Sequence, residues 1–274
     1  MNYFEILGMD KEPFSTSPDP LFFYDSQEHK AALIRILIET RLKRGLSIIL
    51  GDVGTGKTTL CRKLLQMFKE RENMEFYIIL DPTYKTEEIF IEALIRTFGL
   101  NLDKERSNIL DHKQELKNFL FKKGVEQNKT VVLLIDEAQK MNSESLEVLR
   151  MLLNYETNEF KLLQLVLVGQ MELLSQLKGL RNFVDRISLK YILNPFDLHE
   201  VKEMINFRTE KAGNRSRIRL FDDEAIEEIY KFTQGYPRRV SMLCHSALRE
   251  LVITNDNLVT KEVIQQLVSK EILI

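Results

Sequence analysis

The most informative part of the sequence runs from Leu46 to Thr58 and reads LSIILGDVGTGKT. It opens with the short apolar run Leu46–Leu50, which is typical of a buried strand. The pattern G-x-x-x-x-G-K-[ST] follows without a mismatch over Gly51–Thr58, and a helical pattern continues from Lys57 to about Arg71. A strand, a glycine-rich turn and a helix in this order form the context in which this pattern binds nucleotide phosphates.

Each residue type in this loop has a chemical reason. The glycines allow the backbone to wrap tightly, so that successive N–H groups face an anion. The helix N-terminus at Lys57 adds the positive end of a dipole. We expect Lys57 to reach the β- and γ-phosphates and the Thr58 hydroxyl to ligate Mg²⁺. The sequence therefore predicts an ATP site formed by Gly51, Asp52, Val53, Gly54, Thr55, Gly56, Lys57, Thr58 and Thr59.

Two acidic residues, Asp136 and Glu137, directly follow a second apolar run, Val131–Ile135. Because ligands bind outside the carboxyl ends of parallel strands, we expect both to face the phosphate loop. Asp136 is expected to bind the metal, directly or through water, since hard oxygen ligands suit Mg²⁺. Glu137 is expected to polarise the attacking water. The alternative is that the pair is an acidic N-cap of the next helix.

Four further residues are weaker candidates. Gln170 follows another apolar run and is expected to contact the γ-phosphate or the water, or else to be a turn residue that bonds its own backbone. Arg181 and Arg186 fall in a helix that leads to the last predicted strand, and Arg238 projects from a helix that begins at Pro237. Isolated surface arginines usually contribute little, so sequence position alone assigns them no role.

Strand and helix patterns alternate along the first two thirds of the chain, and only helical patterns follow Asn194. This order predicts an α/β fold, namely a P-loop parallel-sheet αβα nucleotide-binding domain (25–194) followed by an all-helical lid domain (195–274). The first 24 residues are rich in Pro and Phe. Prolines prevent a regular helix there, and the aromatic rings are costly to leave in water. We therefore expect an extension packed on the core, close to the first strand.

Composition excludes several classes of protein. The 274 residues hold 39 Lys and Arg against 41 Asp and Glu, a balance that argues against a strongly basic nucleic-acid-binding protein. The two cysteines, Cys61 and Cys244, form neither a metal cluster nor a disulfide framework. No apolar run approaches the roughly 18 residues of a transmembrane span, and Met1–Asp10 lacks the basic region of a signal peptide. We expect a cytoplasmic protein that reaches the inner membrane only through a partner.

With these motifs in hand, the chain resembles the AAA+ ATPases, and among them the ExeA/GspA-type secretion ATPases and their short MshM-like pilus relatives. The residues that carry the resemblance are Phe4–Gly8, Pro13-Phe14, Pro18–Pro20, Ala31–Leu33, Gly51–Thr59, Ile135–Gln139, Leu152–Thr157, Lys161–Leu165, Val168–Leu173 and Gly235–Val240. Two residues depart from the pattern, Asp81 where Asn is usual and Met171 where Pro is usual. Secretion members with a membrane span and a peptidoglycan-binding module continue past Ile274, so we expect a short relative or part of a longer chain.

The resemblance implies a Mg²⁺-dependent ATPase that works as a nucleotide-dependent homo-oligomer, with ATP between the two domains. Gln170 matches the sensor of the γ-phosphate. Arg238 matches the second-domain sensor, which reaches the nucleotide of its own chain. Arg186, with Arg181 as the alternative, matches the region from which a neighbouring subunit supplies an arginine finger.

Three functions are compatible with these features. The leading interpretation is an ATPase that drives assembly or remodelling of a cell-envelope secretion or pilus machine, with a protein of that machine as its partner. The second is a DNA-associated AAA+ regulator similar to the TniB transposition ATPases, with Asn214–Arg219 and Arg41–Arg44 as candidate DNA contacts. A sequence pI near 6.2 disfavours it. The third is a nucleotide-gated scaffold with little turnover, against which the presence of both Lys57 and Glu137 argues.

Overall fold

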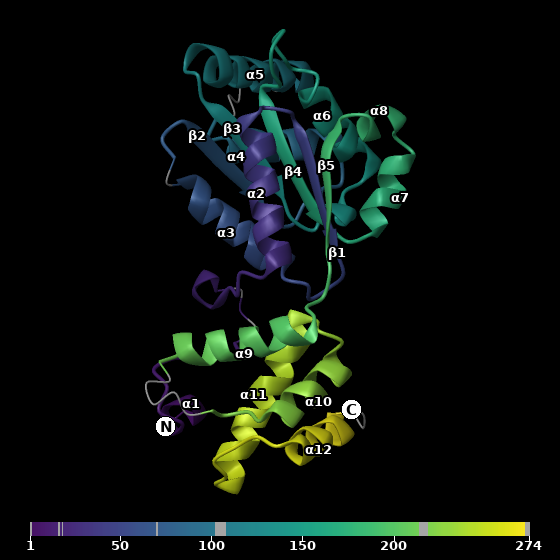
Figure 1. Cartoon of the computed structure of the whole chain (residues 1–274). Coiled ribbons are helices and arrows are strands. Elements are labelled where there is room, and N and C mark those ends of the chain that lie inside the picture. The colour runs from purple at the N-terminus through teal and green to yellow at the C-terminus, as the bar shows by residue number, and fades with distance from the viewer. Residues whose placement is uncertain are drawn as a thin grey trace. The chain divides into compact units, whose positions relative to one another are not determined.

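The structure is a computed structural model that describes residues 2–15, 17, 19–69, 71–101, 108–213 and 219–271 (Figure 1). Contacts within the chain divide it into two compact units. One, here called the helical unit, comprises Met1–Gln27, Val53–Thr59 and Asn194–Ile274. The other, here called the sheet unit, comprises Glu28–Asp52 and Leu60–Leu193. The domain boundaries expected after residues 24 and 194 stay a prediction.

The sheet unit is built on five parallel strands in the order β2-β3-β4-β1-β5. The strands are β1 (Leu46–Gly51), β2 (Met74–Ile79), β3 (Thr130–Ile135), β4 (Leu163–Gly169) and β5 (Ile187–Leu193). Every residue of β1, β3 and β4 is buried. Continuous apolar runs of this kind are expected of central parallel strands that are covered on both faces. The α/β fold with a parallel sheet, predicted from the sequence, is confirmed.

Helices cover both faces of the sheet (Figure 1), and the edge strands show which helix lies on which face. Phe76 of β2 stacks on Phe68 of α3 (Lys57–Lys69) at 5.1 Å between ring centroids. Its neighbour Tyr77 points the other way and meets Phe98, directly after α4 (Glu87–Thr97). On β5, the guanidinium carbon of Arg35 from α2 (Gln27–Arg41) lies 5.3 Å from the Tyr191 ring centroid. The strand register puts Phe76 and Tyr191 on the same face, so α2 and α3 share it.

The opposite face of the sheet packs against α4, α5 (Ile109–Phe121), α6 (Ser143–Leu152) and α7 (Glu172–Lys178). Ile48, Leu133 and Leu165, which come from three adjacent strands, are fully buried in this cluster. Phe90 and Leu149 face them from α4 and α6 and are also fully buried. This apolar cluster holds the strands in place and leaves their carboxyl ends free for polar residues.

Two helices of the sheet unit have distinctive ends. Helix α2 ends at Arg41, because Lys43 and Gly45 have positive φ angles of 51° and 97° that a right-handed helix does not allow. Helix α5 leaves α-helical geometry after Phe121 and continues as the π-helix η2 (Lys122–Glu126).

The helical unit has its own apolar core. Four helices build it: α9 (Leu198–Lys211), α10 (Asp223–Thr233), α11 (Pro237–Thr254) and α12 (Lys261–Glu271). Met9, Phe14 and Phe22 from the N-terminal extension, which includes α1 (Tyr3–Ile6) and η1 (Pro20–Phe22), are buried in the same cluster. The extension is therefore part of the helical core, whereas the sequence suggested a place near the first strand. Packing against these helices removes the aromatic side chains of the extension from water. Within the described ranges, no helix combines the length and apolarity that a membrane crossing requires.

Replacing Gly235 by Ala should lower the free energy of unfolding by about 2–4 kcal/mol. Gly235 has a φ of +73°, and a Cβ built on it would lie 1.9 Å from the carbonyl oxygen of Phe196. Urea unfolding of the variant would measure this loss. Gly8→Ala is the matched control, since Gly8 has a φ of +75° with nothing within 4 Å of a built Cβ. The control should lose only about 1–2 kcal/mol from strain, and equal losses in the two variants would contradict the prediction.

Candidate functional site

The predicted phosphate loop joins the end of β1 at Gly51 to the start of α3 at Lys57. Gly54 and Gly56 have φ angles of +87° and +95°, which residues with a side chain rarely adopt. Lys57 is buried, with 6% of its surface exposed. The loop therefore has the tight, glycine-dependent path expected of a loop whose backbone N–H groups face an anion.

Within the helical unit, the first turn of α11 contacts this loop. The backbone N–H of Arg238 donates to the carbonyl oxygen of Gly54 at 3.2 Å. A Cβ on Gly54 would lie 3.1 Å from the Cβ of Arg238. The Arg238 side chain itself is exposed. The helix start is thus beside the loop, and contact of the guanidinium with a nucleotide stays a prediction.

The acidic pair follows β3 directly. Asp136 is buried, with 2% of its surface exposed, and its N–H donates to the carbonyl oxygen of Ile79 at 2.8 Å. Its Oδ1 accepts the backbone N–H of Glu137 at 2.9 Å. Glu137 has left-handed backbone angles, φ 53° and ψ 34°. For a residue other than glycine this costs about 1 kcal/mol and is most common at functional sites.

Strand register brings three of the predicted residues to one edge of the sheet. Leu50 of β1 is paired with Gly169 of β4, and Ile135 of β3 is paired with Leu167 of β4. The residues that follow these strands therefore emerge together, with β4 lying between β1 and β3. Gly51, Asp136 and Gln170 all lie at this carboxyl edge, which is where α/β sheets bind ligands.

One residue at this edge, Gln139, had no role assigned to it from its sequence position. Gln139 in η3 (Ala138–Lys140) donates from Nε2 to the Glu137 carboxylate at 2.8 Å. Its Oε1 accepts the backbone N–H of Gln170 at 3.1 Å. The signal in the sequence was a polar side chain two residues after Glu137, but only the fold shows that it reaches β4.

The structure does not bring Arg186 to this edge. Arg186 lies after the short helix α8 (Arg181–Val184) and outside it, which corrects the helix predicted through it, because β5 begins at the next residue. Its guanidinium donates to Asn154 Oδ1 at 2.6 Å and to the carbonyl oxygen of Asn182. Ile187 pairs with Leu46, the first residue of β1. At about 3.3 Å per residue, the length of β1 separates Arg186 from the carboxyl edge by roughly 16 Å. The structure describes only the backbone of Arg181.

Part of one segment proposed as a DNA contact lies at the other end of β1 from this edge. Leu42, Lys43 and Arg44 line a hollow of about 600 Å³ together with Lys161 and Arg186. Three acids, Glu156, Glu159 and Asp185, line it too, and burial lowers the pKa of Lys43. The hollow is therefore mixed in charge. Residues 214–218 of the other basic segment lie outside the described residues.

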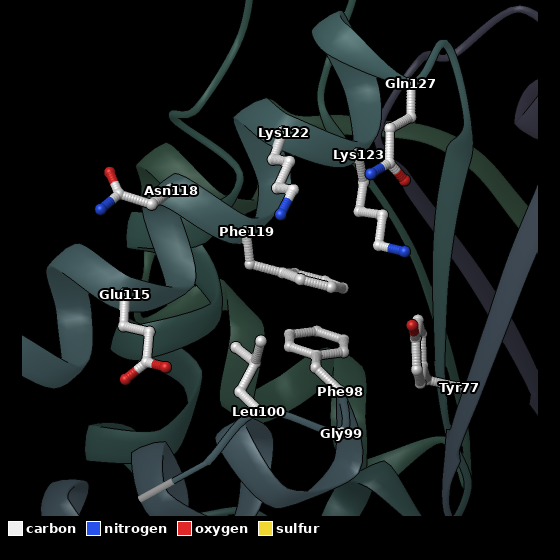
Figure 2. A pocket seen from close by; sticks show the side chains of 10 residues that line it. All are labelled: Tyr77, Phe98, Gly99, Leu100, Glu115, Asn118, Phe119, Lys122, Lys123 and Gln127. Carbon is white, nitrogen blue, oxygen red and sulfur yellow. The ribbon is translucent and has the colours of Figure 1, made fainter. Parts of the chain in front are cut away.

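A further pocket of about 370 Å³, which the sequence did not predict, lies beside edge strand β2 (Figure 2). Phe98 and Phe119 stack in it at 5.0 Å between ring centroids, and Tyr77 meets Phe98 edge-on at 4.9 Å. Its aromatic residues come from β2, from the position directly after α4, and from α5. In the sequence their spacing is that of ordinary buried core residues, so it did not indicate a pocket.

An ion cluster borders this pocket. Glu75 accepts from Lys123 Nζ at 2.7 Å, from Lys129 Nζ at 2.8 Å and from the Tyr77 hydroxyl at 2.8 Å. Burial alone would raise the pKa of Glu75, but these three hydrogen bonds lower it to about 2. Lys123 and Lys129 therefore form a structural ion pair with Glu75.

Comparison with known proteins agrees with this architecture. The sequence profile of the AAA domain family matches residues 40–177. The chain is 35% identical over 248 residues to General secretion pathway protein A of Aeromonas hydrophila. The match covers 90% of this chain, which spans 44% of the length of that protein. The resemblance to secretion ATPases noted in the sequence is thereby confirmed.

Solved structures share the fold. The ORC2 protein of Aeropyrum pernix, solved as ADPNP-ADP complexes, superposes with a TM-score of 0.68 at 17% identity, covering 95% of this chain and 71% of that one. Drosophila ORC bound to DNA gives 0.64 at 20% identity, covering 96% and 66%. The RuvB Holliday junction branch migration motor of Thermotoga maritima gives 0.57 at 18% identity, covering 88% and 68%. At such identities the likeness concerns the fold alone.

Proposed function

The chain belongs to the AAA domain family, and from this premise we propose that it binds ATP with Mg²⁺ and hydrolyses it. The observation that carries the proposal is the shared carboxyl edge of the sheet. There β1 leads into the phosphate loop at Gly51, and β3 leads into Asp136 and Glu137. A loop for phosphates and a carboxylate for water are two of the recurring parts of sites that transfer phosphoryl groups to water.

The residues assigned to the metal fit Mg²⁺ in their chemistry. The Thr58 hydroxyl and the Asp136 carboxylate are oxygen donors, the class that Mg²⁺ prefers beside nucleotide phosphates and water. No group of three His, Cys, Asp or Glu side chains gathers among the described residues to bind a metal by itself. When bound, the ion would neutralise charge on the phosphate oxygens.

In the reaction we propose, the oxygen of a water molecule forms a bond to the γ-phosphorus while the bond from that phosphorus to the β–γ bridging oxygen breaks. ADP leaves with the electron pair of that bond. Glu137 orients the water and accepts its proton, which inorganic phosphate or solvent later receives. Lys57 binds the β- and γ-phosphates, Gln170 senses the γ-phosphate, and Arg238 reaches the nucleotide of its own chain.

We further propose that hydrolysis requires a second copy of the chain. Arg186 directly precedes β5 at the amino edge of the sheet, roughly 16 Å from the edge that carries Asp136. At that distance it cannot reach a nucleotide bound by its own chain, so any catalytic role of Arg186 must be in a neighbouring subunit. Arg181, five residues earlier in the chain, is the alternative source of the finger.

The similarity to General secretion pathway protein A supports a role in a cell-envelope secretion or pilus machine. We propose that ATP turnover drives assembly or remodelling of such a machine, with the chain in the cytoplasm and bound to the inner membrane through a protein partner. The mixed charge of the hollow beside Lys43 and Arg44 gives no support to the DNA-associated alternative.

Lys57→Ala should raise the Kd for ATP more than about a hundredfold, because it removes the charge that binds the β- and γ-phosphates. Titration with a fluorescent ATP analogue would measure the change. Lys69→Ala, at the far end of the same helix, should leave the Kd unchanged. Unaltered affinity of the Lys57 variant would remove the phosphate-loop assignment.

Glu137→Gln should retain ATP affinity and lower kcat by about 10²- to 10⁴-fold, because an amide cannot accept the proton. Steady-state phosphate release, together with the binding titration, separates the two effects. The exposed Glu126→Gln serves as the control of matched chemistry and should behave like the unmodified protein. Surviving turnover in Glu137→Gln would show that another group polarises the water.

Specific ATPase activity should rise with protein concentration, and Arg186→Ala should lower the plateau by about 10³-fold without loss of ATP binding. Arg96→Ala, an exposed change on α4, is the control and should leave the curve unmoved. Full activity at nanomolar protein, with a flat dependence on concentration, would contradict catalysis in trans.

A further inference from the structure

The amide of Gln139 joins the ends of two neighbouring strands. Its Nε2 donates to Glu137 Oε2 at 2.8 Å, just after β3. Its Oε1 accepts the backbone N–H of Gln170 at 3.1 Å, just after β4. One side chain therefore contacts both the carboxylate assigned to the water and the main chain of the residue assigned to the γ-phosphate.

The surroundings of this amide are closely packed. A Cβ on Gly169 would lie 2.9 Å from Gln139 Oε1 and 3.3 Å from its backbone nitrogen. Position 169 must therefore lack a side chain for the end of β4 to approach η3 this closely. On the other side, Gln176 Nε2 of α7 donates to the carbonyl oxygen of Gln139 at 2.8 Å. The backbone of Gln139 is thus anchored while its amide spans the strand ends.

The turn that presents Glu137 is equally restrained. Its N–H bonds Asp136 Oδ1 at 2.9 Å, and its carbonyl oxygen accepts the N–H of Lys140 at 2.9 Å. With the main chain of Glu137 held in a left-handed conformation, the remaining freedom of the residue lies in its side-chain torsions. The hydrogen bond from Gln139 restricts those torsions.

We propose that Gln139 is a positioning residue that couples the carboxylate of Glu137 to the backbone of Gln170 during ATP hydrolysis. This inference rests on the proposed function. Its donation to the carboxylate fixes the direction in which the free oxygen points. Its acceptance from the Gln170 N–H transmits any movement of the β4 end to Glu137, which makes turnover responsive to whatever Gln170 contacts.

Two substitutions separate this role from a purely structural one. Gln139→Met keeps the length of the side chain and removes both hydrogen bonds. It should lower the single-turnover rate of hydrolysis about ten- to a hundredfold, with less than a twofold change in the Kd for ATP. Gln139→Glu keeps the shape and an acceptor for the Gln170 N–H but removes the donor to Glu137. It should be as slow as Gln139→Met, again with less than a twofold change in the Kd for ATP.

The control is Gln265→Glu on α12, an exposed position where the same change of charge should leave the rate and the Kd for ATP unchanged. Urea unfolding of each variant checks that it is folded. A Gln139→Met variant with the rate of the unmodified protein would overturn the proposal. So would a slow Gln139→Met variant whose affinity for ATP has fallen by the same factor, because a loss of both is what a structural role predicts.

The outcome is distinct from failure of the proposed function. If the unmodified protein does not hydrolyse ATP, or if Glu137→Gln hydrolyses it equally well, the ATPase assignment itself fails. If Glu137→Gln is inactive while Gln139→Met retains full rate, only the coupling role of Gln139 is wrong. When both residues act as a unit, the double variant Glu137→Gln/Gln139→Met should be no slower than Glu137→Gln alone.

Discussion

Backbone hydrogen bonds between the parallel strands β3, β4 and β1 determine where a site can form in this protein. Parallel pairing aligns the carboxyl ends of the strands, and the observed register leaves Gly51, Asp136 and Gln170 at one edge. The strands hold this register because their side chains are buried on both faces. A slip by one residue would turn every buried side chain to the other face, so the core that stabilises the fold also specifies the edge at which polar residues meet.

Polar groups at this edge are held by the main chain as much as by one another. Asp136 accepts the N–H of the residue that follows it, and Glu137 has a left-handed backbone. Gln139 then spans from Glu137 to the end of β4. Such strain persists only where neighbouring contacts over-determine it. In this chain those contacts come from η3 and α7. The two helices therefore support the candidate catalytic carboxylate.

The helical unit has a separate core, yet it includes the phosphate-loop residues Val53–Thr59. The N–H of Arg238 at the start of α11 bonds Gly54, and the N-terminal extension shares the core of the same helices. The family to which the chain belongs and its similarity to a secretion protein agree with a nucleotide-driven role.

The sequence alone determined the α/β class with a parallel sheet and predicted the phosphate loop and the acidic pair, because local patterns carry these features: apolar runs, glycine spacing and residues at strand ends. It could not place Gln139 or Arg186. The bond from Gln139 to Gln170 depends on β4 lying beside β3, and the distance of Arg186 from the edge depends on the pairing of the next residue, Ile187, with the start of β1. Contacts between residues 31 or more than a hundred positions apart are products of strand order and register, which only the tertiary structure decides.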